Sequence, residues 1–236
     1  GAGGPGAPET ASRSLVWQPL DGSRPPATLF NAADRAPGTQ EGEGAGGGRV
    51  AVSSTVMFAP KLHFGVFPGG ALAVAHTADY RIQVTGTGPS VPTARFLERP
   101  LQPRRVTAAD RERARETERA RLRQGAVVIS PHGGGQGGLP AGLLDRQVDA
   151  MQFADVIPVV QGLAVDRAGR LWVQRAGPQW GQPGPIDLLT AQGGYVGTVT
   201  GIEMPAAFAE GRAAWIETDA DGVQRVVVSS LPASWR

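Results

Sequence analysis

The chain has 236 residues, no cysteine, and 23 basic against 21 acidic residues, which gives a formal net charge of +2 at pH 7. The lack of cysteine excludes disulfides, thiolate metal sites and cysteine nucleophiles. Because the net charge is close to zero and no apolar run approaches the roughly 18–20 residues that cross a bilayer, we expect no nucleic-acid partner and no membrane span.

The first 48 residues alternate between polar, glycine-rich stretches and one short hairpin. Residues 1–12 contain too few apolar side chains to form a core and predict a disordered lead-in. Two short apolar runs within 14–30 flank Asp21-Gly22, which is a typical hairpin turn. Residues 31–48 end in GAGGGR and predict a long loop.

A series of short strands follows, over 49–60, 62–85 and 93–100. Pro68-Gly69-Gly70 separates two strands of the middle stretch, and a second polar turn at 76–79 separates the next. This spacing predicts an antiparallel meander.

Residues 106–125 interrupt the strands with the clearest helix pattern of the chain. Thr107 and Asp110 form a capping signature, and Gly125 lies where a helix would end. The sequence also predicts three salt bridges along this helix and a second short helix over 143–153. The predicted salt bridges, each between residues three positions apart, join Glu112 to Arg115, Glu116 to Arg119, and Glu118 to Arg121. The Gly-rich stretch at 133–142 lacks the Gly-Lys-Ser/Thr ending of a phosphate loop and predicts a linker.

Residues 156–231 return to strands. In GLAVDRAGRLWVQR, at 162–175, Asp166 would cap its own turn and Gly169 would take a positive φ, so this stretch predicts two strands joined by a tight turn. Leu171 and Val173 would then face one neighbouring sheet and Trp172 the other.

Three stretches share the order of a small-residue strand, a glycine turn, a more apolar strand, a polar turn and a third strand. They cover 64–84, 162–199 and 206–228. Repeated small sheets of this kind are typical of propeller blades, which cover one another's faces when they stack radially.

VDRAGRLWVQR followed by IDLLTAQGGYVGTV resembles the blades of bacterial six-bladed β-propeller proteins of the NHL and TolB-like kind. FPGGALAVAHTADYRIQV and DADGVQRVVVSSL fit the same pattern, so the resemblance covers 60–100, 155–231 and, less closely, 14–30. It implies an all-β protein with a six-bladed type of β-propeller, complete or partial, and a helical insertion. By analogy with the family it also implies a periplasmic or extracellular location.

The expected organisation is a lead-in at 1–12, propeller blades at 13–100, a helical and Gly-rich insertion at 101–155, and C-terminal blades at 156–236. A four-stranded blade takes roughly 40–45 residues, and the residues outside the lead-in, the loop and the insertion would form about three to four blades. If the ring closes, residues near 14–18 would supply the fourth strand of the last blade.

A propeller binds its ligand where the loops that enter the inner strands converge, at the mouth of the channel. His63 and Gln161 immediately precede two such strands, and Arg175 and Trp180 lie on a loop between outer strands. We therefore expect these four residues to contact an unknown small molecule or protein.

The resemblance also leaves an enzymatic alternative, a metal-assisted lactone or ester hydrolase. The hydrolases of this fold use a Glu, Asn and Asp cluster around a central Ca²⁺, whereas Asn31 is the single asparagine of this chain and lies outside the blade repeats. The three histidines match no zinc motif, and no G-x-S-x-G elbow occurs. The sequence therefore predicts a binding module, with no catalytic residue, metal site or cofactor. A third alternative is contact of the arginine-rich helix, which has eight arginines in 104–123, with nucleic acid.

Overall fold

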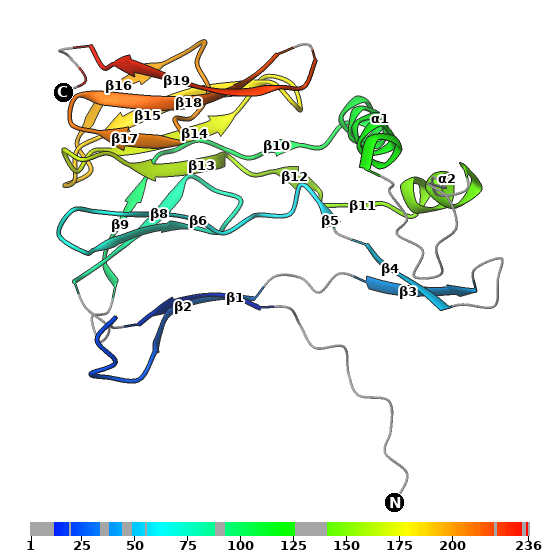
Figure 1. Cartoon of the computed structure of the whole chain (residues 1–236), viewed down its shortest axis with the longest axis horizontal. Coiled ribbons are helices and arrows are strands. Elements are labelled where there is room, and N and C mark those ends of the chain that lie inside the picture. The colour runs from blue at the N-terminus through cyan, green and yellow to red at the C-terminus, as the bar shows by residue number, and fades with distance from the viewer. Residues whose placement is uncertain are drawn as a thin grey trace, which may run out of the picture. The chain divides into compact units, whose positions relative to one another are not determined.

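The computed structural model describes residues 12–18, 20–33, 38–43, 49–54, 56–87, 93–125, 141–219, 221–232 and 235. Short strands, almost all of them antiparallel, are the main secondary structure of these residues, as the sequence predicts (Figure 1). No helix among them is long and apolar enough to cross a membrane.

The chain divides into two compact units, and each is composed of separate segments. The first unit takes its described residues from Gly1–Ser12, Ala33–Ala59 and Arg105–Ile157. The second is composed of Arg13–Ala32, Pro60–Arg104 and Pro158–Arg236.

The first unit holds both helices and several short strands. Its elements are β3 (Gly38–Glu43), β4 (Arg49–Ser54), β5 (Val56–Met57), α1 (Ala108–Gly125), α2 (Ala141–Asp149), β11 (Gln152–Phe153) and β12 (Val156–Ile157). β3 pairs with β4, β5 pairs in parallel with β11, and β12 pairs with β10 (Arg104–Arg105). The prediction of a loop over 31–48 is wrong at 38–43, which forms β3, and at 31–33, which belongs to the strand β2 (Ala27–Ala33). Residues 34–37 and 44–48 lie outside the described residues. The glycines and charged residues of GTQEGE give no strand signal.

The capping signature of α1 is confirmed. The Thr107 hydroxyl accepts a hydrogen bond from the Asp110 amide at 3.2 Å, and the Asp110 carboxylate accepts one from the Thr107 amide at 3.0 Å. This reciprocal pair satisfies two amides that a helix start leaves without partners.

Two of the three predicted salt bridges of α1 form. Glu112 lies 3.5 Å from Arg115, and Glu118 lies 2.5 Å from Arg121. The third prediction is wrong, because Arg119 pairs at 3.3 Å with Glu112, seven positions earlier, instead of with Glu116.

The second unit contains a hairpin and three antiparallel meanders. The hairpin is β1 (Ser12–Trp17) with β2 (Ala27–Ala33). Sheet I has β6 (His63–Val66), β7 (Leu72–Ala75), β8 (Arg81–Thr85) and β9 (Thr93–Glu98). Sheet II has β13 (Val160–Val165), β14 (Leu171–Ala176), β15 (Pro183–Leu189) and β16 (Tyr195–Val199). Sheet III has β17 (Ala207–Ala209), β18 (Arg212–Thr218) and β19 (Gln224–Ser230). In each meander the strands are ordered as they are along the chain.

Sheets I and II pack on one another through an apolar core. Sheet I contributes Ala73, Ala75, Tyr80, Ile82 and Val84, and sheet II contributes Leu163, Leu171, Val173 and Leu189. Their first strands, β6 and β13, are neighbours. A Cβ atom at Gly65 would come within 2.8 Å of Val165 Cγ2, so the close approach of these two strands requires a glycine.

Sheets II and III pack through a second core centred on Trp172, which is fully buried. Its ring lies 5.1 Å from that of Phe208 and 6.0 Å from that of Trp235, measured between centroids. Leu171 and Val173 belong to the first core and Trp172 to the second. The predicted division of these side chains between two neighbouring sheets is confirmed.

The tight turn between β13 and β14 also forms as predicted. The Gly169 amide donates to the Asp166 carbonyl at 3.0 Å, and Gly169 has a φ of +79°. The buried carboxylate of Asp166 accepts from the Arg170 amide at 2.9 Å and so caps the turn.

The described strands do not form a closed ring. Sheet III has three strands, and β19 is its outer edge. β1, at 12–17, which would complete the last sheet of a closed ring, pairs instead with β2.

Candidate functional site

The four residues predicted to bind a ligand lie at the ends of strands in sheets I and II. His63 is the first residue of β6, opposite Ala75. Gln161 occupies a bulge near the start of β13, beside Val160, which lies opposite Arg175. Trp180 belongs to the connection between β14 and β15. We call this end of the stacked sheets, where β6 and β13 begin, the entry end. It differs slightly from the prediction, since His63, Gln161 and Arg175 lie within strands rather than on loops.

Two of these residues have environments that restrict their roles. The Gln161 side-chain amide donates to the Pro158 carbonyl at 2.7 Å, which holds the side chain against its own backbone. Burial and the neighbouring Lys61 charge lower the pKa of His63, so this imidazole is neutral at pH 7. It can act as a hydrogen-bonding group but not as a positive charge.

Arg175 belongs to a charged cluster that joins sheets I and II. Its Nε lies 3.2 Å from Oδ2 of Asp187, a fully buried carboxylate on β15. Arg99, which follows β9, also forms an ion pair with Oδ2 of Asp187, and the Thr198 hydroxyl donates to Oδ1 at 2.5 Å. The Tyr195 hydroxyl lies 2.7 Å from that of Thr198. Asp187 therefore holds two guanidinium groups that come from different sheets.

Tyr80 adds a neutral hydroxyl to this cluster. Its side chain is buried, with its hydroxyl close to Asp187 and Arg99. Burial and the nearby Asp187 charge raise the pKa of Tyr80, so it stays protonated. The Arg99 guanidinium lies 5.7 Å from the Tyr80 ring centroid and 4.9 Å from that of Tyr195.

The cluster carries a surplus of one positive charge, because two arginines share one carboxylate. Burial opposes the charge of Arg99, but its hydrogen bond and attraction to Asp187 raise its pKa, and it remains charged. The arginine side chains are 32% exposed at Arg99 and 24% at Arg175, whereas Asp187 is not exposed. The accessible part of the cluster is therefore cationic.

Sequence reasoning identified Arg175 but missed Asp187, Arg99 and Tyr80. Arg99 and Asp187 are 88 positions apart, so no local pattern joins them. One signal in the sequence could have identified Asp187, which is the single charged residue of the apolar run PIDLL. A carboxylate in such a run is expected to be buried, and a buried carboxylate needs a cationic partner.

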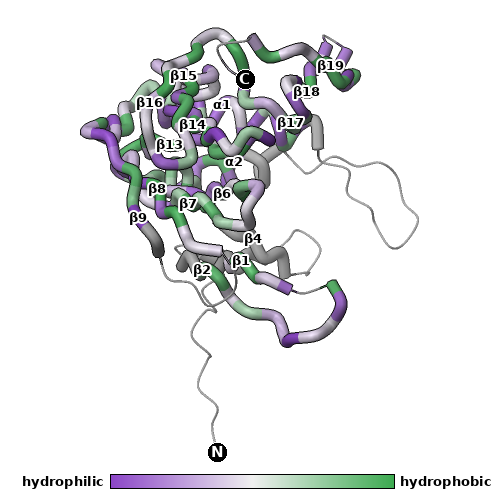
Figure 2. The backbone as a smooth tube through the Cα atoms, turned by 90° about the vertical axis from the view of Figure 1, so that its left-hand side faces the viewer, coloured by the Kyte–Doolittle hydropathy of each residue, from purple (hydrophilic) through white to green (hydrophobic). Residues whose placement is uncertain are grey.

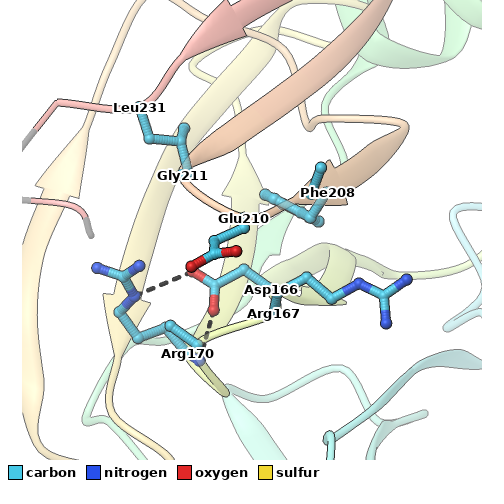
Figure 3. A pocket seen from close by; sticks show the side chains of 9 residues that line it. Asp166, Arg167, Arg170, Phe208, Glu210, Gly211 and Leu231 are labelled. Carbon is cyan, nitrogen blue, oxygen red and sulfur yellow. Dashed lines mark hydrogen bonds and ion pairs between the residues drawn. The ribbon is translucent and has the colours of Figure 1, made fainter.

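A pocket of about 830 Å³ lies at the opposite end of the stack, between the β13–β14 and β17–β18 turns. Figure 3 shows Arg170 turned back toward Asp166, while Arg167 extends away from it. The Asp166 carboxylate is committed to Arg170 and Trp172, which leaves Glu210 and Arg167 as the charged groups able to meet a ligand. Among the described residues, no group of three or more His, Asp or Glu is placed to hold a metal ion.

Comparisons with protein-family models, with curated proteins and with solved structures found no match to this chain.

Proposed function

We propose that the protein is a binding module composed of propeller-type blades, and that its entry end binds a ligand carrying a carboxylate or a similar anionic group. Three meanders of three or four strands pack face to face, and the first strands of sheets I and II are neighbours. These features support blades, because propeller blades are meanders whose first strands lie closest together.

The observation that favours an anionic ligand is that two arginines, Arg99 and Arg175, share a single carboxylate, that of Asp187. Both guanidinium groups keep N–H donors beyond those that face Asp187, since each carries five. An arginine that is partly desolvated and already oriented loses little entropy when it binds an anion. The guanidinium groups of Arg99 and Arg175 are therefore preorganised to bind one further negative charge.

The chemistry of the neighbouring groups fits a small organic anion. Gln161 and Trp180 belong to the same end of sheet II as Arg175, as the strand register shows. At that end of the sheet, the amide of Gln161 and the indole of Trp180 would offer hydrogen bonding and an apolar surface for the rest of the ligand. The ligand could be free or could be a side chain of a partner protein.

Isothermal titration with succinate and with citrate tests this proposal. We expect binding to the wild-type chain that weakens with added salt, and a loss of at least roughly tenfold in Arg175→Gln. Arg225→Gln is the matched control, since it also removes a guanidinium paired with a carboxylate, on sheet III and at an exposed site. Equal binding by both variants, or no heat from either anion with the wild-type chain, would reject the anion site.

The hydrolase remains a prediction that no observation favours. Assays with lactones and esters in the presence of Ca²⁺ would test it directly.

A further inference from the structure

We infer that β19 is a dimerisation edge, at which a second copy of this chain adds its own β19 in antiparallel orientation. This inference does not depend on the proposed ligand. It concerns sheet III, which is one strand shorter than sheets I and II in the described part of the chain.

Among the described strands, β19 is the edge strand of sheet III. β19 pairs with β18 along its whole length, from Gln224 opposite Thr218 to Ser230 opposite Arg212. None of the other described strands pairs with its free side. Edge strands that must stay unpaired usually carry a lysine, a proline or a bulge, whereas β19 reads QRVVVSS and has one charge, Arg225. That charge is held by Glu217 of the same sheet at 2.7 Å.

Apolar side chains lie on both faces beside this edge. The strand register places Val226 and Val228 on one face with Ile216 and Ala214. Val226 is 70% exposed, Val228 59% and Ile216 49%. Figure 2 shows green hydrophobic positions next to purple hydrophilic ones in β18 and β19. Exposed apolar residues gathered at one strand edge indicate an interaction surface rather than scattered surface residues.

A groove of about 760 Å³ lies on the other face of the same strands. Its lining includes Trp215, Val227, Ile202 and Trp235. Val227 lies directly opposite Trp215 in the register, so its side chain faces this groove. A strand added beside β19 would place alternate side chains in the groove and over the exposed valines.

The strand of a second copy matches these surfaces. Antiparallel pairing centred on Val227 sets Val226 opposite Val228 of the other copy, and Arg225 opposite Ser229. No two like charges then face each other, so the pairing is electrostatically acceptable. The central Val227 of each copy enters the groove of the other. The arrangement is two-fold symmetric, as most homodimers are.

The test measures the mass of the full chain by sedimentation velocity over a concentration series up to roughly 100 µM. We expect a dimer for the wild-type chain and a monomer for Val226→Lys, which places a charge at the edge. Val223→Lys is the matched control, because Val223 is 61% exposed and precedes β19, so that dimer should persist. A monomeric wild-type chain, or equal dimer in both variants, overturns the proposal.

Single cysteines test the register, and the cysteine-free chain makes them unambiguous. Val227→Cys lies on the symmetry axis, where opposite Cα atoms are about 4.5–5.5 Å apart and a disulfide fits. Ser230→Cys lies opposite Gln224 of the other copy and should not cross-link. Cross-linking at Val227 with none at Ser230 supports the pairing, and equal cross-linking at both positions, or at neither, contradicts it.

Discussion

The indole of Trp172 donates a hydrogen bond of 3.1 Å from Nε1 to Oδ2 of Asp166, and both side chains are buried. The same carboxylate accepts from the Arg170 amide at 2.9 Å and from Arg170 Nε at 3.0 Å. One aspartate thus closes the β13–β14 turn and fixes the largest side chain of the core between sheets II and III. A residue whose sequence context marks it as a turn former has a second role in the core.

Replacing Asp166 by alanine should lower the free energy of unfolding by about 2–4 kcal/mol, because the buried indole N–H loses its acceptor and the turn loses its cap. Urea unfolding followed by circular dichroism measures the loss. Asp219→Ala is the control, since Asp219 caps the β18–β19 turn through the amides of Asp221 and Val223 but is exposed. We expect a loss of about 1 kcal/mol or less there. Equal losses would contradict the role of Asp166 in the core.

Replacing Asp187 by asparagine should cost about 3–5 kcal/mol, because two guanidinium groups would then surround an uncharged amide. Adding Arg99→Met to Asp187→Asn should restore part of that loss, since one of the unpaired charges is removed. A double-mutant cycle of these two changes, measured by urea unfolding, should show a coupling of about 1–3 kcal/mol. Additive losses would mean that Arg99 and Asp187 do not act on each other.

Tyr80 should remain un-ionised in the folded protein above the ordinary tyrosine pKa of about 10. The fold raises the pKa of Tyr80, so the stability linked to it is present below that pH and is lost as the pH rises further. The chain has two tyrosines, and Tyr195→Phe leaves Tyr80 as the one reporter. Ultraviolet absorbance of tyrosinate should appear together with the loss of near-ultraviolet ellipticity. Ionisation of Tyr80 while the ellipticity persists would show that it is not buried in the cluster.

Replacing Thr107 by alanine should destabilise α1 by about 1 kcal/mol, because the Asp110 amide loses its acceptor at the helix start. Helical ellipticity during thermal unfolding is the measurement. Thr117→Ala is the control within the same helix, because the Thr117 hydroxyl bonds the Arg113 carbonyl on an exposed face. That change should be neutral or slightly stabilising, since alanine has the higher helix propensity. A larger effect at Thr117 than at Thr107 would argue against the cap.

The features that could be predicted from sequence are those with local causes. Asp166 and Gly169 lie three positions apart and determine a turn, and Thr107 and Asp110 determine a helix start in the same way. The alternation of Leu171, Trp172 and Val173 was enough to assign each to its core. β3 was missed because its glycines and charged residues have a low propensity for strands. It is a strand because it pairs along its whole length with β4.

The cluster around Asp187 was missed because its members are distant in sequence. Arg99 becomes its partner once sheets I and II are packed, and the packing depends on contacts that no short pattern encodes. The same holds for β19, whose valines predict a strand but not which side of it stays unpaired.

The core between sheets I and II is formed by two parts of the chain that are far apart in sequence, which affects how the protein folds during its synthesis on the ribosome. Sheet I is complete at Glu98, and sheet II begins at Val160. At about 5–20 residues per second, the ribosome needs roughly 3–12 seconds to make the chain between them. During that time Ala73, Ile82 and Val84 have no sheet II to cover them. A newly made sheet I therefore leaves this apolar face uncovered for several seconds, until sheet II has been synthesised and can pack on it.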